Sequence, residues 1–306
     1  MRITLFLLIL CSPSAAFAQT SHDGLTKITE GCYGKLNNDN LVFVKVESIT
    51  SMKPYYLDLQ SGVEKLLTDE PANIPIGWMN DSTVVFFKKN DDKKFIYQLN
   101  INNGSTIQTM TLDSIIQPEL YIGFDKGVMV RTNHYLEDPL QKTYRQDLNT
   151  GSISLIHELT GRKIRRISYN KNKDLIAFIE IEGEELFLKI LESGQVRMIH
   201  KYHSENYAYQ CPLIFNETGT ELFFAEIENS ISTLNRCDLA SDKISQVHSF
   251  KGGVKCMDLS LSNKNLLIMT QDENADTKSE KIDDGRFEYT LKLQFGLGIY
   301  LLNIPH

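Results

Sequence analysis

The stretch Asp174-Leu-Ile-Ala-Phe-Ile-Glu180 decides the fold, because its pattern of an apolar run after a polar turn recurs along the chain. The starts of the copies lie 42 to 48 residues apart. This regular spacing indicates that the chain consists of repeats of one structural unit. The other five copies are Asn40–Val46, Ser82–Lys88, Lys126–Arg131, Glu221–Glu226 and Asn265–Thr270.

Each unit contains signals for three further strands. A short strand precedes the polar turn, as in Pro75–Trp78, and a third strand ends in a tight turn, as in Tyr55–Gly62. Gly supplies the positive φ that such a turn requires, and Asn or Asp can replace it. A fourth strand follows, as in Val63–Leu67, and helical periodicity is not apparent. Four strands per repeat of 40 to 45 residues predict an all-β, six-bladed β-propeller of four-stranded antiparallel blades. A β-sandwich or solenoid is the alternative, but a sandwich does not repeat at this period.

The two ends of the chain predict how the ring closes. Gly298–His306 matches the third strand of a unit and has no fourth strand after it. Gly24–Thr29 lines up with the fourth-strand segment Gly62–Leu67. We therefore expect the N-terminal strand to complete the last blade, which removes an open sheet edge that would invite aggregation.

The first 18 residues have the pattern of a secretory signal peptide. Arg2 is followed by the apolar run Ile3–Leu10 and by Ala16-Phe17-Ala18, a small-x-small cleavage site. A membrane anchor would need about 20 apolar residues. Cys11 lacks the small residues that usually precede a lipidated cysteine. We predict a signal peptide over 1–18, a single propeller domain over 19–306, export to the periplasm or the medium, and no membrane span.

The composition limits the partner classes. The chain has 306 residues, 42 % hydrophobic and 23 % charged, with 32 Lys and Arg against 39 Asp and Glu and a net charge of −7. This is ordinary globular composition. No basic surplus is present to neutralise phosphates, so we expect no nucleic-acid partner.

Some segments resemble the repeat of the TolB-like and WD-repeat-like propellers of exported bacterial proteins. The segments Trp78–Val84 and Phe215–Leu222 are similar to the family's Trp-Ser-Pro-Asp-Gly-x-x-Leu motif, although no copy has it complete. Leu57–Gly62 and Asp147–Gly151 match its Asp-Leu-x-x-Gly turn. The resemblance implies the propeller fold and says little about function, because propellers host scaffolds, receptors, lyases and hydrolases.

Histidines and cysteines are candidates for metal binding and for disulfide formation. His157, His200 and His248 occupy one repeat position, which we place on the outer fourth strands, where three ligands cannot meet at the roughly 2 Å that zinc needs. We therefore predict no metal site.

Cys32, Cys211 and Cys256 each begin a first strand in neighbouring units and are the candidates for a disulfide, with reduced buried thiols as the alternative.

Two excursions from the repeat provide the candidate binding residues. The longer, Gln271–Leu291, contains Asp272 and Asp276 in a spacing that resembles the start of a calcium loop. Thr277 stands where such a loop needs Gly, so we expect a solvated acidic loop and no cofactor. The shorter excursion contains His134 and Tyr135. Both connect second to third strands and therefore emerge on one face of the ring.

Signatures of a catalytic nucleophile are absent from the sequence: there is no Gly-x-Ser-x-Gly, no His-Glu-x-x-His and no Gly-rich phosphate loop. We therefore name no catalytic residue.

The basic run Gly161–Arg166 is expected to be a solvated strand face, with an anion or acidic-partner patch as the alternative. The leading hypothesis is an exported, non-enzymatic propeller that binds a protein or peptide through loops on one face. The alternative is a carbohydrate-active lyase or hydrolase with its site in the axial funnel.

Overall fold

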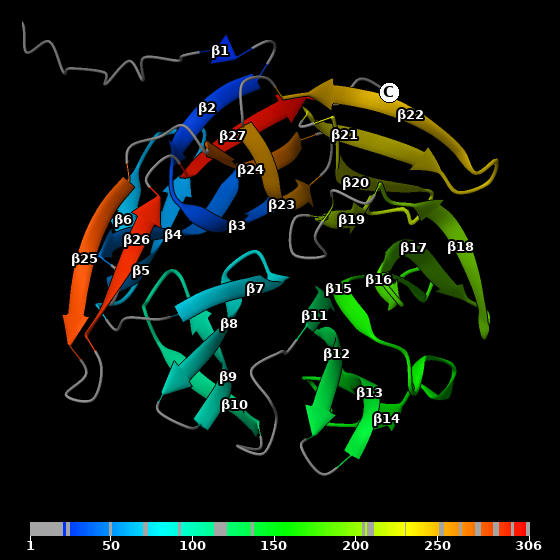
Figure 1. Ribbon diagram of the computed structural model, residues 1–306. Helices are drawn as coiled ribbons and strands as arrows, with labels where there is room; N and C mark the ends of the chain where they lie inside the picture. The colour runs from blue at the N-terminus through cyan, green and yellow to red at the C-terminus, as the bar shows by residue number, and fades with distance from the viewer. Residues whose placement is uncertain are drawn as a thin grey trace, which may run out of the picture.

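The computed structural model of the chain is a ring of antiparallel sheets arranged around a central axis (Figure 1). It describes residues 21–22, 25–48, 51–69, 73–90, 93–112, 121–135, 138–203, 206, 211–229, 231–250, 254–262, 265–272, 277–283, 288–294 and 297–303. The predicted signal peptide, 1–18, lies outside these residues. Within them the strands form six blades, as the repeat predicts, and no helix is long and apolar enough to cross a membrane.

The first three blades follow one another along the chain, each with its first strand innermost. Blade 1 contains β3 (Cys32–Asn37), β4 (Asn40–Ser48), β5 (Ser51–Asp58) and β6 (Glu64–Leu66). Blade 2 contains β7 (Asn73–Asn80), β8 (Thr83–Asn90), β9 (Lys93–Asn100) and β10 (Thr106–Leu112). Blade 3 contains β11 (Tyr121–Asp125), β12 (Val128–Tyr135), β13 (Asp138–Asp147) and β14 (Ile153–Leu155).

The remaining blades complete the ring. Blade 4 contains β15 (Ile164–Asn170), β16 (Leu175–Glu182), β17 (Glu185–Glu192) and β18 (Gln195–Lys201). Blade 5 contains β19 (Leu213–Phe215), β20 (Glu221–Glu228), β21 (Ile231–Asp238) and β22 (Lys243–Ser249). Blade 6 contains β23 (Val254–Ser262), β24 (Asn265–Asp272), β27 (Leu297–Asn303) and, from the other end of the chain, β2 (Leu25–Glu30).

The N-terminal strand closes the ring, as predicted. Strand β2 pairs antiparallel with β27, with Thr26 opposite Leu301 and Lys27 opposite Tyr300. The short strand β1 (Ser21–His22) adds a further outer strand to this blade. Leu25 is 2 % exposed and packs with Phe223 of blade 5, so β2 is anchored by a side chain as well as by its backbone.

The second strand of each blade is apolar on both faces because each face is covered by a neighbouring blade. In β4, Val42 packs with Val84 of blade 2, while Phe43 packs with Leu267 of blade 6. The same alternation recurs around the ring, since successive side chains of a strand point to opposite faces. One buried cluster therefore lies between each pair of adjacent blades. This explains why the repeat is a continuous apolar run rather than an alternating one.

The turns between third and fourth strands have the predicted chemistry. Gly62, Gly104, Gly151 and Gly194 have φ of 71°, 71°, 74° and 77°. In blade 5 the equivalent residue is Asp242, with φ 54°. An aspartate thus replaces glycine in the left-handed region at one of five equivalent turns.

Two local predictions were wrong. The repeat also predicts one fourth strand over Ser152–Leu159, but β14 ends at Leu155 and the 3₁₀ turn η1 (His157–Leu159) follows. Ile156 and Leu159 are both buried between blades 3 and 4, and a 3₁₀ turn places residues three apart on one side. The acidic excursion of blade 6 is not simply a loop, because β25 (Thr277–Asp283) and β26 (Glu288–Gln294) pair as a two-stranded sheet.

We predict that Leu25→Ala lowers the free energy of unfolding by about 2–5 kcal/mol, because it leaves a cavity in a closed cluster and loosens the closing strand. Lys27→Ala, in the same strand but partly exposed, should cost about 0.5 kcal/mol or less. Urea denaturation of residues 19–306 measures both. Equal stabilities of the two variants would show that β2 does not close the ring.

Candidate functional site

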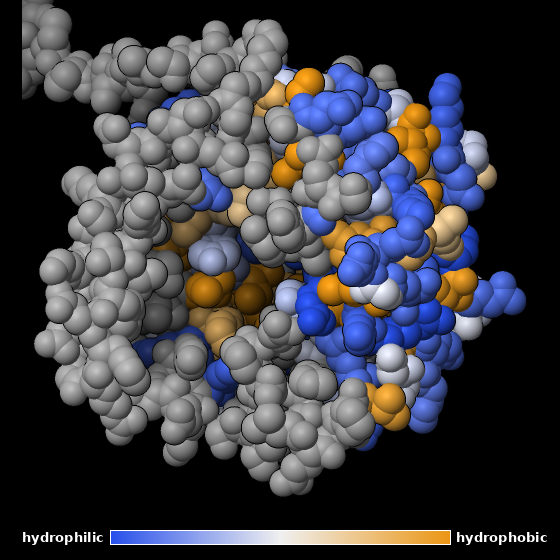
Figure 2. Space-filling view, in the orientation of Figure 1, coloured by the Kyte–Doolittle hydropathy of each residue, from blue (hydrophilic) through white to orange (hydrophobic). Residues whose placement is uncertain are grey.

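An axial cavity of about 810 Å³ runs along the inner strands of all six blades. Figure 2 shows the ring hollowed at its centre, with hydrophobic residues in the depth of the hollow. We call the end where first and second strands are joined the turn face. The opposite end, where second and third strands are joined, is the loop face. The volume is in the range of pockets that hold small molecules or short chain segments.

The repeat places lining residues at three levels of the cavity. The level nearest the loop face, which we call the loop-side ring, lies four residues before the last residue ahead of each turn that joins first and second strands. It contains Tyr33, Ile76, Tyr121, Arg166, Pro212 and Asp258. Two residues further along each strand is the middle ring: Lys35, Trp78, Gly123, Ser168, Ile214 and Ser260. The turn-side ring is Asn37, Asn80, Asp125, Asn170, Asn216 and Ser262.

The middle ring ties inner strands of adjacent blades together. The indole Nε1–H of Trp78 donates to the carbonyl of Lys35 at 2.9 Å. The backbone N–H of Leu36 donates to the hydroxyl of Ser260 at 2.9 Å. Gly123 has no side chain, and a Cβ there would lie 2.8 Å from Ile167 Cγ2 of blade 4. These contacts fix the diameter of the cavity at its middle.

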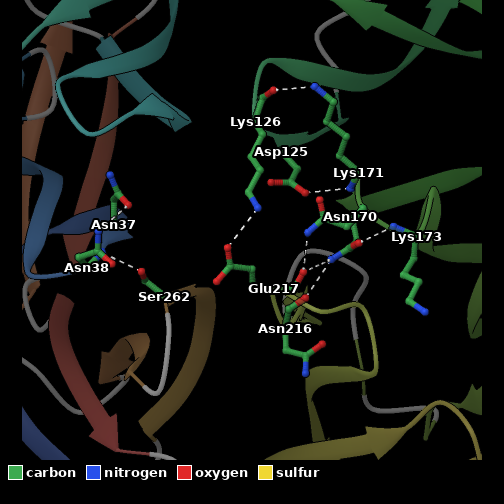
Figure 3. A network of polar contacts seen from close by, with 11 residues as sticks. Asn37, Asn38, Asp125, Lys126, Asn170, Lys171, Lys173, Asn216, Glu217 and Ser262 are labelled. Atoms are coloured by element: carbon green, nitrogen blue, oxygen red, sulfur yellow. Dashed lines mark hydrogen bonds and ion pairs between the residues drawn. The ribbon is translucent and has the colours of Figure 1, made fainter.

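Three residues of the turn-side ring, Asp125, Asn170 and Asn216, belong to a polar network that joins blades 3, 4 and 5 (Figure 3). The side chain of Asn170 donates to the carbonyls of Asn216 at 2.9 Å and Glu217 at 3.1 Å. The backbone N–H of Lys171 donates to Asp125 at 2.8 Å, and Lys126 pairs with Glu217 at 3.1 Å. Burial raises the pKa of Asp125, and the hydrogen bond from Lys171 partly offsets this. We interpret this end as structural, because its side chains hold the turns to one another.

The loop-side ring has a different character. Its charged residues are Arg166 and Asp258, and Lys35 of the middle ring lies 3.3 Å from Asp258. The guanidinium of Arg166 donates to the carbonyl of Met257 in blade 6 at 3.2 Å. Burial raises the pKa of Tyr33, Cys32 and Asp258 raise it further, and Arg166 lowers it. Two cations, one carboxylate and a phenol thus face one part of the cavity.

Sequence reasoning did not single out Tyr33 or Arg166. Arg166 was assigned to a solvated strand face, but a bulge between Arg165 and Ile167 interrupts the alternation of β15 and gives Arg166 φ 47°. Of the same basic run, Arg162 pairs with Glu180 at 2.8 Å and Arg165 lies over the ring of Tyr121. The signal that could have found Arg166 is the repeat register, which places it level with Tyr33, Tyr121 and Asp258.

The predicted binding residues lie on the second strands, toward the loop face. His134 and Tyr135 end β12, and Asp272 ends β24. Asp276 lies outside the described residues. The backbone therefore places the three described positions around one face of the ring, and their role in binding remains a prediction.

The candidate disulfide residues occupy separate places. Cys32, Cys211 and Cys256 are all buried, as is Cys237. Cys211 packs between blades 4 and 5, Cys256 between blades 5 and 6, and Cys32 with Val44 and Met269. The structure thus places these cysteines in three different clusters, and the disulfide stays a prediction.

The three equivalent histidines do not share an environment. His200 lies in β18 and its Nε2 is 2.7 Å from Glu226, while His248 lies in β22 with its ring against Phe250. His157 is in η1, not in a fourth strand as expected. Among the described residues, no three His, Cys, Asp or Glu side chains form a group that could hold a metal ion.

Comparison with solved structures finds proteins that share this fold. No family model and no curated protein matches the sequence. An oligogalacturonate lyase in complex with manganese superposes with a TM-score of 0.58 at 12 % identity, covering 94 % of this chain and 95 % of that chain. TolB from Acinetobacter baumannii superposes with a TM-score of 0.54 at 16 % sequence identity. The match covers 69 % of this chain and 53 % of TolB. A chain from a nidogen/laminin complex superposes with a TM-score of 0.56 at 14 % sequence identity. The match covers 84 % of this chain and 95 % of that chain.

These likenesses confirm the predicted TolB-like six-bladed propeller as a fold. The identities of 12 to 16 % are too low to carry function from any of the three. The printed names also differ in kind, since one is a lyase and another belongs to a protein complex. One fold hosts unrelated activities, so the function must be argued from the cavity itself.

We predict that the buried thiols are unreactive in the folded protein. Burial raises the pKa of Cys32 and Cys211 to about 12 and that of Cys237 to about 11, so each stays protonated at pH 8. A soluble disulfide reagent should modify none of the four in folded 19–306 and all four in denaturant. Two modified thiols in denaturant would instead show that a disulfide had formed.

The same shifts give the stability a pH dependence. The folded pKa of these thiols is above the unfolded value of about 8.5, so the unfolded chain loses protons first as the pH rises. Their contribution to stability is therefore complete below about pH 8.5 and is lost as the pH approaches the folded values. Urea midpoints measured from pH 7 to pH 10 should fall progressively. A midpoint that rises over this range would contradict the assignment.

Proposed function

We propose that this chain is an exported binding propeller that takes a protein or peptide partner on its loop face and receives an extended segment of that partner in the axial cavity. The observation that carries the proposal is the cavity of about 810 Å³, with its polar network at the turn face and its mixed lining toward the loop face. The pattern of Met1–Ala18 supports export.

The lining suits an extended peptide. Apolar side chains such as Ile76 and Ile214 line the same cavity as groups that donate or accept hydrogen bonds, such as Tyr33 and Arg166. A peptide offers both kinds of surface, because its backbone needs hydrogen bonds while its side chains bury apolar area. A rigid ring also loses little conformational freedom on binding, which favours affinity.

A carbohydrate-active lyase or hydrolase is the second candidate. One observation favours it: Tyr33, Lys35, Arg166 and Asp258 line a single cavity. A phenol or an ammonium group can transfer a proton, and ammonium and guanidinium groups stabilise a developing anion. The solved lyase that resembles this chain is named as a manganese complex. In the described part of this chain no cluster of candidate metal ligands is present, so we place this function second.

The test is selection of binders from a random peptide library on immobilised 19–306. We expect enriched peptides to bind wild type and Ile153→Trp alike, because Ile153 is 54 % exposed on the outer strand β14. Ile76→Trp, which fills the cavity at the loop-side ring, should weaken binding about tenfold or more.

Two results would contradict the proposal. One is enrichment of peptides that bind Ile76→Trp as well as wild type, which would place the contact outside the cavity. The other is no enrichment over a blank surface together with cleavage of oligogalacturonides by wild type, followed by the ultraviolet absorbance of an unsaturated product. The second result would favour the lyase.

A further inference from the structure

One wall of the axial cavity is apolar. Its side chains are half-buried, come from blades 2 and 3, and both line the cavity and pack on the buried cluster between these two blades. We call them the apolar wall: Ile76, Met79, Phe87, Ile122 and Phe124. Among the described residues, no other cluster between adjacent blades contributes more than two half-buried apolar side chains to the cavity.

The cluster behind the wall is the smallest of its kind. In the described part of the chain it has fewer buried members than any other of the six clusters between adjacent blades, namely Val85, Ile96, Met129 and Leu148. The wall residues that pack on it are half-buried rather than buried, so part of their apolar surface faces the cavity. A ligand that displaces water from apolar surface in a concave site gains free energy of binding.

Two glycines let the wall side chains cross the boundary between the blades. The ring of Phe124 in blade 3 lies directly on the backbone of Gly77 in blade 2, where a Cβ would overlap Cδ1 and lie 3.2 Å from Cγ. Met79 of blade 2 crosses in the other direction, and its Cε would lie 3.4 Å from a Cβ at Gly127. Phe124 is thus fixed before a ligand arrives, which favours affinity, while the flexible thioether of Met79 can adjust to the ligand.

The chemistry of the wall selects the kind of group that it accepts. None of its five side chains has an N–H or O–H group, and none is charged. In the described lining, the charged residues of the loop-side and middle rings are Lys35, Arg166 and Asp258, which come from blades 1, 4 and 6. A sugar hydroxyl or a carboxylate placed against the wall would lose water without gaining a hydrogen bond. A large apolar side chain incurs no such cost.

We propose that the apolar wall is the specificity site of the cavity and takes one large apolar side chain of the partner segment. This rests on the proposed function and names the chemistry of the segment that enters. Ile76 belongs to the loop-side ring, and Ile122 directly follows Tyr121 of that ring. The wall therefore begins at the level where a segment from the loop face enters the cavity.

Trp78 makes the proposal measurable without a label. It is the single tryptophan of the chain, and it lines the cavity in the middle ring, two residues after Ile76. Its fluorescence therefore reports occupancy of the cavity. The probes are acetylated and amidated peptides of the form Ser-Ala-Ser-X-Ser-Ala-Ser, in which X is leucine, glutamine or alanine. Trigalacturonate is the carbohydrate probe.

We expect the leucine peptide to bind about tenfold tighter than the alanine peptide and than the glutamine peptide, whose central side chain is of similar size but polar. Phe124→Ala and Ile122→Asn should remove most of this preference, because the first takes away the fixed ring and the second puts an amide in the wall. Phe187→Ala is the matched control and should keep the preference. Phe187 is a half-buried phenylalanine of the third strand β17, with its ring under Lys189 and Lys201 and outside the cavity lining.

Thermal unfolding of each variant shows whether it is folded, and the peptide comparison on wild type tests the proposal without any variant. Equal binding of the three peptides, each weakened by Ile76→Trp, would overturn this inference and leave the proposed function standing. A leucine preference that survives in folded Phe124→Ala and Ile122→Asn would also overturn it, because the apolar contact would then lie elsewhere. If none of the peptides binds, the inference fails, and binding of trigalacturonate would then overturn the proposed function as well.

Discussion

The pairing of β2 with β27 is the constraint on which the rest of the structure depends. Each blade buries both faces of its second strand, so every blade needs a neighbour on each side. An open row of blades would leave two apolar faces in water, and only a closed ring covers them all. Closure is achieved by residues from the far end of the chain, which makes the last blade a joint product of both termini.

The closed ring determines the site. Because six inner strands surround one axis in a common register, residues from sequence positions far apart share a level of the cavity. The turn-side level is occupied by side chains that hold turns together, as Asn170 does. The loop-side level departs from regular strand geometry at Tyr33 and Arg166. These two residues lie in bulges at the loop-side ends of β3 and β15.

The fold could be predicted from the sequence to a large extent. The fold follows from three signals: the apolar runs, the turns, and the match of Gly24–Thr29 to a fourth strand. The first of these shows which residues are buried, and hydrophobic periodicity is the main sequence signal of secondary structure. The candidate site could not be predicted to the same extent. A bulge shifts the alternation by one residue, so Arg166 was placed on a solvated face when it lines the cavity. Cys32, Cys211 and Cys256 share a repeat position but pack in three different clusters, which the repeat position does not specify.

Amide hydrogen exchange on the chain without its first 18 residues tests the central claim most directly. In a sealed ring, the backbone amides of Leu25–Glu30 are bonded in a sheet whose other members come from the C-terminal end. The account predicts that they exchange as slowly as those of β27 and open together with blade 6. Exchange of Leu25–Glu30 at the rate of a free chain, with β24 and β27 still protected, would contradict the closed ring and the cavity that depends on it.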